Sequence, residues 1–129
     1  MKMIGIALII FLLVSCAPSP QQEISVDNPY APQEGDSGLT RAKAYVEIAD
    51  WSPADNKLHL AGSLPTPCNQ LRVSFTQAEG KLTFDVYSLT DPKQMCAEMI
   101  QPFDVFLAVK NMPVKGISIL VNGEVIFSQ

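Results

Sequence analysis

Most of the chain after residue 40 alternates between hydrophobic and polar positions with a period of two. Alternation of this kind is typical of half-buried β-strands, whose successive side chains point to opposite faces of a sheet. We therefore expect about seven short strands, in the runs Ala44–Ile48, Leu58–Gly62, Leu71–Phe75, Leu82–Tyr87, Phe103–Val109, Ile117–Val121 and Val125–Phe127.

Turn residues separate these runs at regular intervals. Asn122-Gly123 lies between two alternating runs and predicts a tight hairpin, because both positions of that turn require a positive φ. Gly80 indicates a second hairpin, and most other breaks contain proline. Short strands with closely spaced turns predict an all-β fold, an antiparallel β-sandwich.

One segment, residues 91–100, carries helix signals instead. Asp91 suits the N-cap and Pro92 suits the first helical position. Met95 and Met99 are four residues apart and would share one face of a helix. We expect one or two helical turns here, crossing between the sheets and packing through the methionines.

The beginning of the chain has the pattern of an export signal. Lys2 precedes an uninterrupted apolar run of 11 residues, Ile4–Val14. This run is shorter than the ~20 residues needed to span a bilayer. We expect residues 1–15 to be a signal peptide that is removed.

The apolar run leads directly into Leu13-Val14-Ser15-Cys16, which resembles the lipobox of bacterial lipoproteins. The resemblance implies cleavage before Cys16, a diacylglycerol on its sulfur, and anchoring of the protein in a membrane of the bacterial cell envelope. That membrane would be the outer membrane in a diderm organism, since residue 17 is not Asp, and the plasma membrane in a monoderm one. A plain secretory signal with an incidental cysteine is the alternative.

The segment before the first strand has linker composition, with four prolines and no hydrophobic periodicity. We expect residues 16–40 to form the lipidated N-terminus and a flexible tether, and residues 41–129 to form the sandwich. The alternative is that Ile24, Val26 and Tyr30 dock on the sandwich as an extra edge strand.

Charge and length narrow the classes of partner. The chain has 129 residues, which is enough for one domain, with 9 Lys and Arg against 13 Asp and Glu. Without a basic run, nucleic acid is not an expected partner. After loss of Lys2 the formal net charge is −5, from 8 basic and 13 acidic residues. This excess of acid argues against a polybasic attachment to anionic lipid, so the acyl chains would anchor the protein alone.

Roughly the last 75 residues resemble an immunoglobulin-like domain of envelope-anchored bacterial proteins. The residues that carry the resemblance are Gly62-Ser63-Leu64-Pro65-Thr66-Pro67-Cys68, Leu71-Arg72-Val73, Cys96, Pro102-Phe103 and Val121-Asn122-Gly123. The resemblance implies a fold and a disulfide, and it brings no activity with it. The antibody signature is absent, because Trp51 precedes both Cys68 and Cys96.

The three cysteines have different expected fates. With Cys16 lipidated, Cys68 and Cys96 form an even pair in an oxidising compartment, so we expect a disulfide between them. The bond would tie the proline-rich loop after Leu64 to residues 91–102. No Cys-x-x-Cys spacing exists, so redox catalysis is not indicated.

Enzyme and metal functions find little support in the sequence. A single His excludes chemistry that needs two, no Ser lies in a nucleophile-elbow context, and we expect neither a catalytic site nor a cofactor. Soft-metal binding is a remote alternative, because copper(I) prefers thioether, thiolate and imidazole ligands. The residues of those types are His59, Met95, Cys96, Met99 and Met112.

The expected function is a non-catalytic binding or structural module that contacts another envelope protein or a glycan. The expected binding loop is Leu64, Pro65, Thr66 and Pro67, which prolines and the disulfide would stiffen. The alternative is a protease-inhibitor-like protein that presents the same loop. Trp51 is a second candidate for recognition, unless it folds back as a lid over the core.

Overall fold

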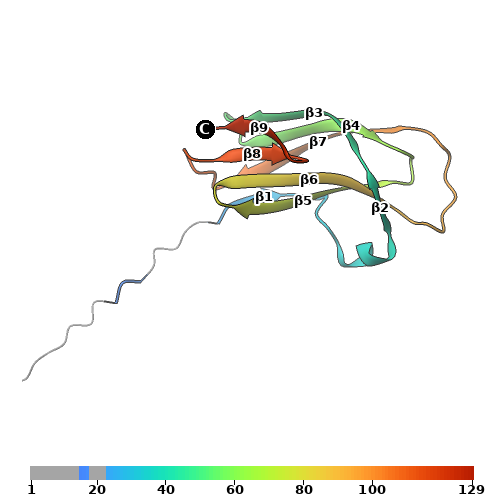
Figure 1. The fold of residues 1–129 in the computed structure, drawn as a ribbon, viewed down its shortest axis with the longest axis horizontal. Helices are drawn as coiled ribbons and strands as arrows, with labels where there is room; N and C mark the ends of the chain where they lie inside the picture. Colours follow the sequence, from blue (N-terminus) through green and yellow to red (C-terminus); the bar gives the residue numbers. More distant parts are fainter. Residues whose placement is uncertain (1–14, 18–22) are drawn as a thin grey trace, which may run out of the picture.

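Two β-sheets pack face to face in the computed structural model, which describes residues 15–17 and 23–129 (Figure 1). The predicted signal peptide therefore lies outside the described residues, apart from Ser15. Sheet I has four antiparallel strands, in the order β1 (Ser25–Asp27), β7 (Gln101–Lys110), β4 (Lys57–Leu64) and β3 (Tyr45–Ser52). Sheet II has five strands, namely β2 (Thr40–Lys43), β5 (Gln70–Ala78), β6 (Lys81–Thr90), β8 (Ser118–Val121) and β9 (Glu124–Ser128).

The predicted all-β sandwich is confirmed, and the alternation of the sequence explains it. In β4, Leu58 and Leu60 are buried between the sheets, whereas His59 lies on the outer face. The apolar runs that form β5, β6, β7 and β8 contribute in the same way to one continuous core. The runs that form β3 and β9 contribute less, since Val46 and Phe127 are only partly buried and Ile48 and Val125 are exposed. That core includes Leu71, Val73, Leu82, Phe84, Val86, Val105, Leu107, Val109, Ile117, Ile119 and Val121.

Both predicted hairpins are present. Val121 pairs with Glu124 and Ala78 pairs with Lys81, which leaves two residues in each turn. All four turn residues have a positive φ, as a tight hairpin requires.

The expectation of a purely antiparallel sandwich is wrong at one pair, since β8 runs parallel to β6. After β6 the chain crosses to sheet I as β7 and returns to sheet II as β8. It therefore enters β8 at the end of the sandwich where β6 begins. The strand β2 occupies the other half of the same edge of β6, so the two short strands together cover it.

The helix expected at residues 91–100 is also wrong. Only a turn forms there, in which Asp91 Oδ1 accepts a hydrogen bond from the backbone N–H of Lys93 at 2.9 Å. A helix this short is stable only when one face packs on the rest of the protein. Met95 and Met99 have no such surface beneath them, because both are exposed.

The expected tether is wrong from Ile24 onward, where the chain is bound to the sandwich. Ile24 is buried in the core, and Val26 pairs with Val109 as part of β1. The chain then follows the free edge of β5, where the carbonyl of Tyr30 accepts a hydrogen bond of 2.9 Å from the N–H of Val73. We call residues 23–39 the strap. The structure therefore confirms the edge-strand alternative. The strap also contains a 3-10 helix, η1 (Glu34–Gly38).

An ion pair holds the strap against sheet II. Arg72 in β5 donates two hydrogen bonds of 2.9 Å to the carboxylate of Asp36 in η1. Two further N–H groups of Arg72 donate to the carbonyl of Leu71 and the side chain of Gln70, both at 3.0 Å. The Arg72 side chain is only 9% exposed, so this charge is almost fully removed from water and depends on these partners.

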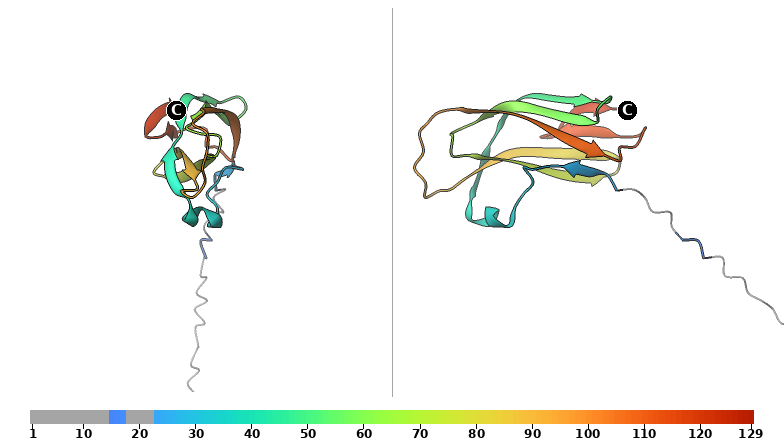
Figure 2. Two further views of the ribbon diagram at one scale, coloured as in Figure 1. Left: turned by 90° about the vertical axis from the view of Figure 1, so that its right-hand side faces the viewer. Right: turned by 180° about the vertical axis from the view of Figure 1, so that it is seen from behind.

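The chain changes sheets between β2 and β3. It passes directly over Gly62 of β4, where a Cβ atom would overlap the backbone carbonyl of Tyr45. Glycine is needed here for close backbone approach and not for an unusual φ. β2 and β3 thus follow one another almost without a break, and this extended run of chain belongs first to sheet II and then to sheet I (Figure 2).

Protonation of Asp36 tests the ion pair. Hydrogen bonding from Arg72 and from the backbone of Gln33 lowers the pKa of Asp36 below its ordinary value of 3.8. The stabilisation is therefore fully present above the unfolded-state pKa and is lost as the pH falls through the folded-state pKa. We expect Asp36→Asn to lower the urea midpoint at neutral pH and to remove this part of the acid dependence, measured from pH ~6 to ~2.

The matched control is Asp85→Asn. Asp85 pairs with Arg41 on the surface, with side chains that are 44% and 59% exposed. Such pairs contribute little, so the urea midpoint should barely move. Equal effects of the two substitutions would contradict a special role for the buried pair.

Candidate functional site

The two ends of the sandwich differ in what they carry (Figures 1 and 2). At one end, which we call the tether end, the side chain of Asn111 donates a hydrogen bond of 3.1 Å to the carbonyl of Glu23, where the folded part of the chain begins. The C-terminal Gln129 pairs there with Ile117. At the opposite end, which we call the tip, lie the loop after β4 and the segment 91–100.

The predicted disulfide between Cys68 and Cys96 is confirmed, and it lies at the tip. The two Cα atoms are 6.1 Å apart and 28 residues apart in sequence. The bond joins the loop after β4 in sheet I to the segment that leaves β6 in sheet II. Cys16 is the free, exposed cysteine of the described residues.

A chain of hydrogen bonds holds the same loop in place. The Thr66 hydroxyl donates to Asn69 Oδ1 at 2.6 Å, and Asn69 Nδ2 donates to Ser88 Oγ at 3.0 Å. Ser88 then donates to the carbonyl of Lys43 at 2.7 Å. Asn69 and Ser88 are buried, so each bond forms in a poorly solvated setting where it is stronger.

Sequence reasoning did not identify Asn69 and Ser88. A usable signal was present for Ser88, which occupies an inward position of β6 after Leu82, Phe84 and Val86. A polar residue in an apolar register requires a buried partner. Nothing in the local sequence identifies that partner as Asn69.

The structure corrects the expected binding loop. Leu64 is only 5% exposed and belongs to the core, so it is not available to a partner. Pro65 and Thr66 are half-buried, and only Pro67 of the four is exposed. The disulfide and the hydrogen bonds of Thr66 and Asn69 attach the loop to the sandwich, and it presents little surface of its own.

The accessible apolar residues of the tip lie on the other side of the disulfide. Met95, Met99 and Ile100 are 97%, 65% and 70% exposed. We call these three residues the tip surface. Large apolar residues exposed in one segment are typical of interaction sites, and methionine is enriched in them.

Trp51 lies at the tether end. Its side chain packs against the core, and its ring centroid is 6.3 Å from that of Phe127. The side chain is half-buried. The structure therefore agrees with the lid interpretation for the side that faces the core.

The residues suited to copper do not come together. The sulfur of Cys96 is used in the disulfide. His59 lies on the outer face of sheet I, where Nε2 is 2.8 Å from Asp104 and the ring stacks on Phe106 at 4.4 Å. Met112 follows β7 at the tether end, whereas Met95 precedes β7 at the tip.

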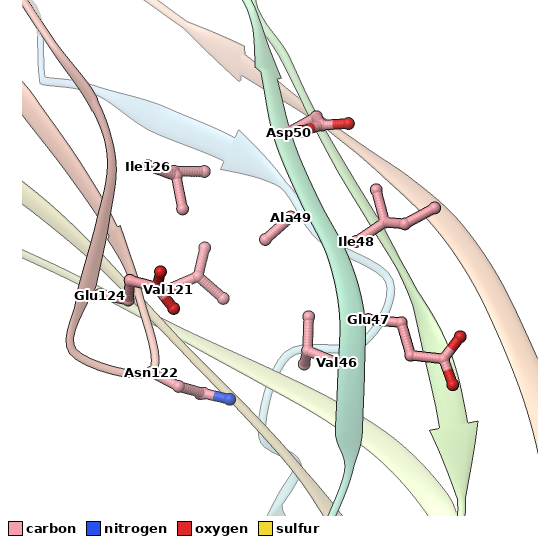
Figure 3. Close-up of a pocket in the computed structure, with 9 residues that line it drawn as sticks. All are labelled: Val46, Glu47, Ile48, Ala49, Asp50, Val121, Asn122, Glu124 and Ile126. Atoms are coloured by element: carbon pink, nitrogen blue, oxygen red, sulfur yellow. The ribbon is translucent and has the colours of Figure 1, made fainter.

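A cavity of about 460 Å³ opens between the edge strands β3 and β9 (Figure 3). Val46 and Ala49 extend toward Val121 and Ile126 across it, whereas Glu47 extends away from it. We call this cavity the seam. Apolar residues of both strands line it together with the polar residues Asp50, Asn122 and Glu124.

Two further observations concern residues 15–17 and 23–129. No three His, Cys, Asp or Glu side chains of these residues gather so that they could hold a metal ion. The same residues contain no helix of the length and hydropathy that crossing a bilayer requires. Comparisons with family models, with curated proteins and with solved structures found no match.

Removal of the disulfide should weaken the fold. We expect the double variant Cys68→Ala, Cys96→Ala to lower the free energy of unfolding by about 3–4 kcal/mol, because the bond restricts the unfolded chain. Urea unfolding measures the change, and Cys16→Ser is the control that should leave it unaltered. Intact mass after alkylation without reductant should show one free thiol in the unlipidated protein, and three would contradict the bond.

Proposed function

We propose that the protein is a lipid-anchored envelope protein whose sandwich is a non-catalytic binding module that presents the tip surface to another envelope protein. The observation that carries the proposal is the placement of the tip surface at the opposite end from the point where the chain leaves for Cys16. An anchor at Cys16 would direct the tip surface away from the membrane.

The docked strap makes this orientation more definite than a long tether would. Ile24 is fixed in the core, so only the residues between it and Cys16 can act as a linker. At ~3.3–3.6 Å per residue, this part of the chain spans at most ~30 Å. The tether end would stay close to the bilayer.

The tip is preorganised for binding. The disulfide and the Thr66–Asn69–Ser88 hydrogen bonds fix the base of the segment that carries Met95 and Met99. Binding then costs less conformational entropy than it would for a free loop. The protease-inhibitor alternative is less favoured than this proposal, because Leu64, which the loop would present, is buried in the core.

The lipid anchor is tested by Cys16→Ser. We expect the variant to remain an uncleaved precursor or to become freely soluble, whereas the parent partitions into detergent, because the sulfur would carry the acyl chains. Detergent phase partitioning and intact mass check this. A variant that still loses its signal peptide and partitions like the parent would contradict the anchor.

The tip surface is tested by site-specific photo-crosslinking in living cells. We expect a discrete protein adduct from a photoreactive residue at Met95 and none from one at Val125, which is also exposed but lies in β9. Adding Met99→Ser and Ile100→Ser should lower the adduct yield about tenfold or more, because two apolar contacts are lost. Equal yields from Met95 and Val125 would contradict the proposal.

A further inference from the structure

At the tether end, Trp51, Met112 and Phe127 pack partly buried against the core, and their outer sides form an apolar surface with Pro113 and Val114. Trp51, Met112, Pro113, Val114 and Phe127 line a shallow cavity of about 280 Å³ there. We call these five residues the anchor face. Val114 is 78% exposed, and Trp51 covers the core with one side while its other side borders the cavity.

Lysines surround the anchor face. Lys57 and Lys81 begin β4 and β6, Lys110 ends β7, and Lys115 lies in the loop that carries Val114. All four are exposed, and within the described residues none of them forms an ion pair.

Acidic residues at the same end offset these charges. They are Glu23, Asp27, Asp50, Asp55 and Glu79, so four lysines and five carboxylates leave this end with a net charge of −1. Most of the net charge of −5 that follows from the sequence after Cys16 therefore lies on the rest of the sandwich. The average charge of the chain argues against contact with anionic lipid, but this end carries little of that charge.

The short segment between Cys16 and Ile24 determines what the tether end faces. The strap starts at Glu23, which Asn111 binds beside the anchor face. The few residues between Cys16 and Ile24 span at most ~30 Å. A lipid on Cys16 would thus hold the anchor face, and not the tip, next to the bilayer.

We propose that the anchor face rests in the headgroup region of the membrane that holds the protein. This inference rests on the proposed lipid anchor, and it adds a second contact that fixes the tilt of the sandwich. Tryptophan suits the boundary between water and hydrocarbon, because its ring is apolar and its N–H is polar. The lysines would lie beside the lipid phosphates, where each lysine would raise the equilibrium constant for membrane association about fivefold.

Trp51 is the only tryptophan of the chain, so its fluorescence reports on the anchor face directly. The experiment uses residues 16–129, with the free thiol of Cys16 coupled to a maleimide lipid. The vesicles contain phosphatidylethanolamine, phosphatidylglycerol and brominated phosphatidylcholine. Chemical coupling supplies the anchor whether or not cells lipidate Cys16, so failure of this inference is distinguishable from failure of the proposed function.

We expect the bromine atoms to quench Trp51 on the vesicles, and iodide to quench it several-fold less than in the uncoupled protein. Val114→Asp should abolish both effects, because a carboxylate would have to enter the interface. Met95→Asp at the tip is the matched control and should preserve them. Lys115→Gln should lower the ratio of docked to undocked anchor face about fivefold.

Three results would overturn the inference. The first is attachment shown by flotation with Trp51 emission and iodide quenching unchanged. The second is protection from iodide without quenching by bromine, which would mean that a second copy of the chain covers the anchor face. The third is an equal loss of quenching in Val114→Asp and Met95→Asp.

Discussion

The charge of Arg72 constrains the path of the strap across sheet II. A guanidinium in the wall of a sandwich is costly unless every donor is paired, and the decisive partner, Asp36, comes from far away in the sequence. This pairing fixes the strap on the outside of sheet II. The strap in turn sets where β2 begins, and the crossing over Gly62 then delivers the chain to sheet I.

One consequence is a molecule with two unlike ends. The residues of the strap are bound to the sandwich and cannot act as a linker. Only the short segment between Cys16 and Ile24 therefore separates Cys16 from one end of the sandwich. The other end is stiffened by a covalent bond and by buried hydrogen bonds, and it carries exposed methionines. In the proposed function, a short attachment and a rigid distal contact work together, because the first orients the second.

The strands were predictable because their signal is local. Residues such as Leu58 and Leu60 report the buried face of β4 directly, and Asn122-Gly123 specifies its hairpin through φ alone. The strap was not predictable in the same way. Its residues show no period, and it is held by contacts such as Asp36 with Arg72 that are distant in sequence.

The features of the candidate site also divide into those that the sequence predicts and those that depend on tertiary packing. The disulfide followed from parity and compartment, whereas the exposure of Met95 and the burial of Leu64 depend on how loops pack at the tip. A helix pattern in residues 91–100 was misleading, because helical spacing has no effect without a surface to pack on.

If the protein is anchored as proposed, the seam affects how copies of the chain meet one another on the membrane. Proteins held on a membrane meet one another at high local density, and an open strand edge invites pairing between copies and then aggregation. The edge of β3 contains a β-bulge between Val46 and Ile48, which interrupts the regular ladder that a second copy would need. Glu47 and Glu124, on opposite sides of the seam, add like charge, which disfavours edge-to-edge pairing of two copies.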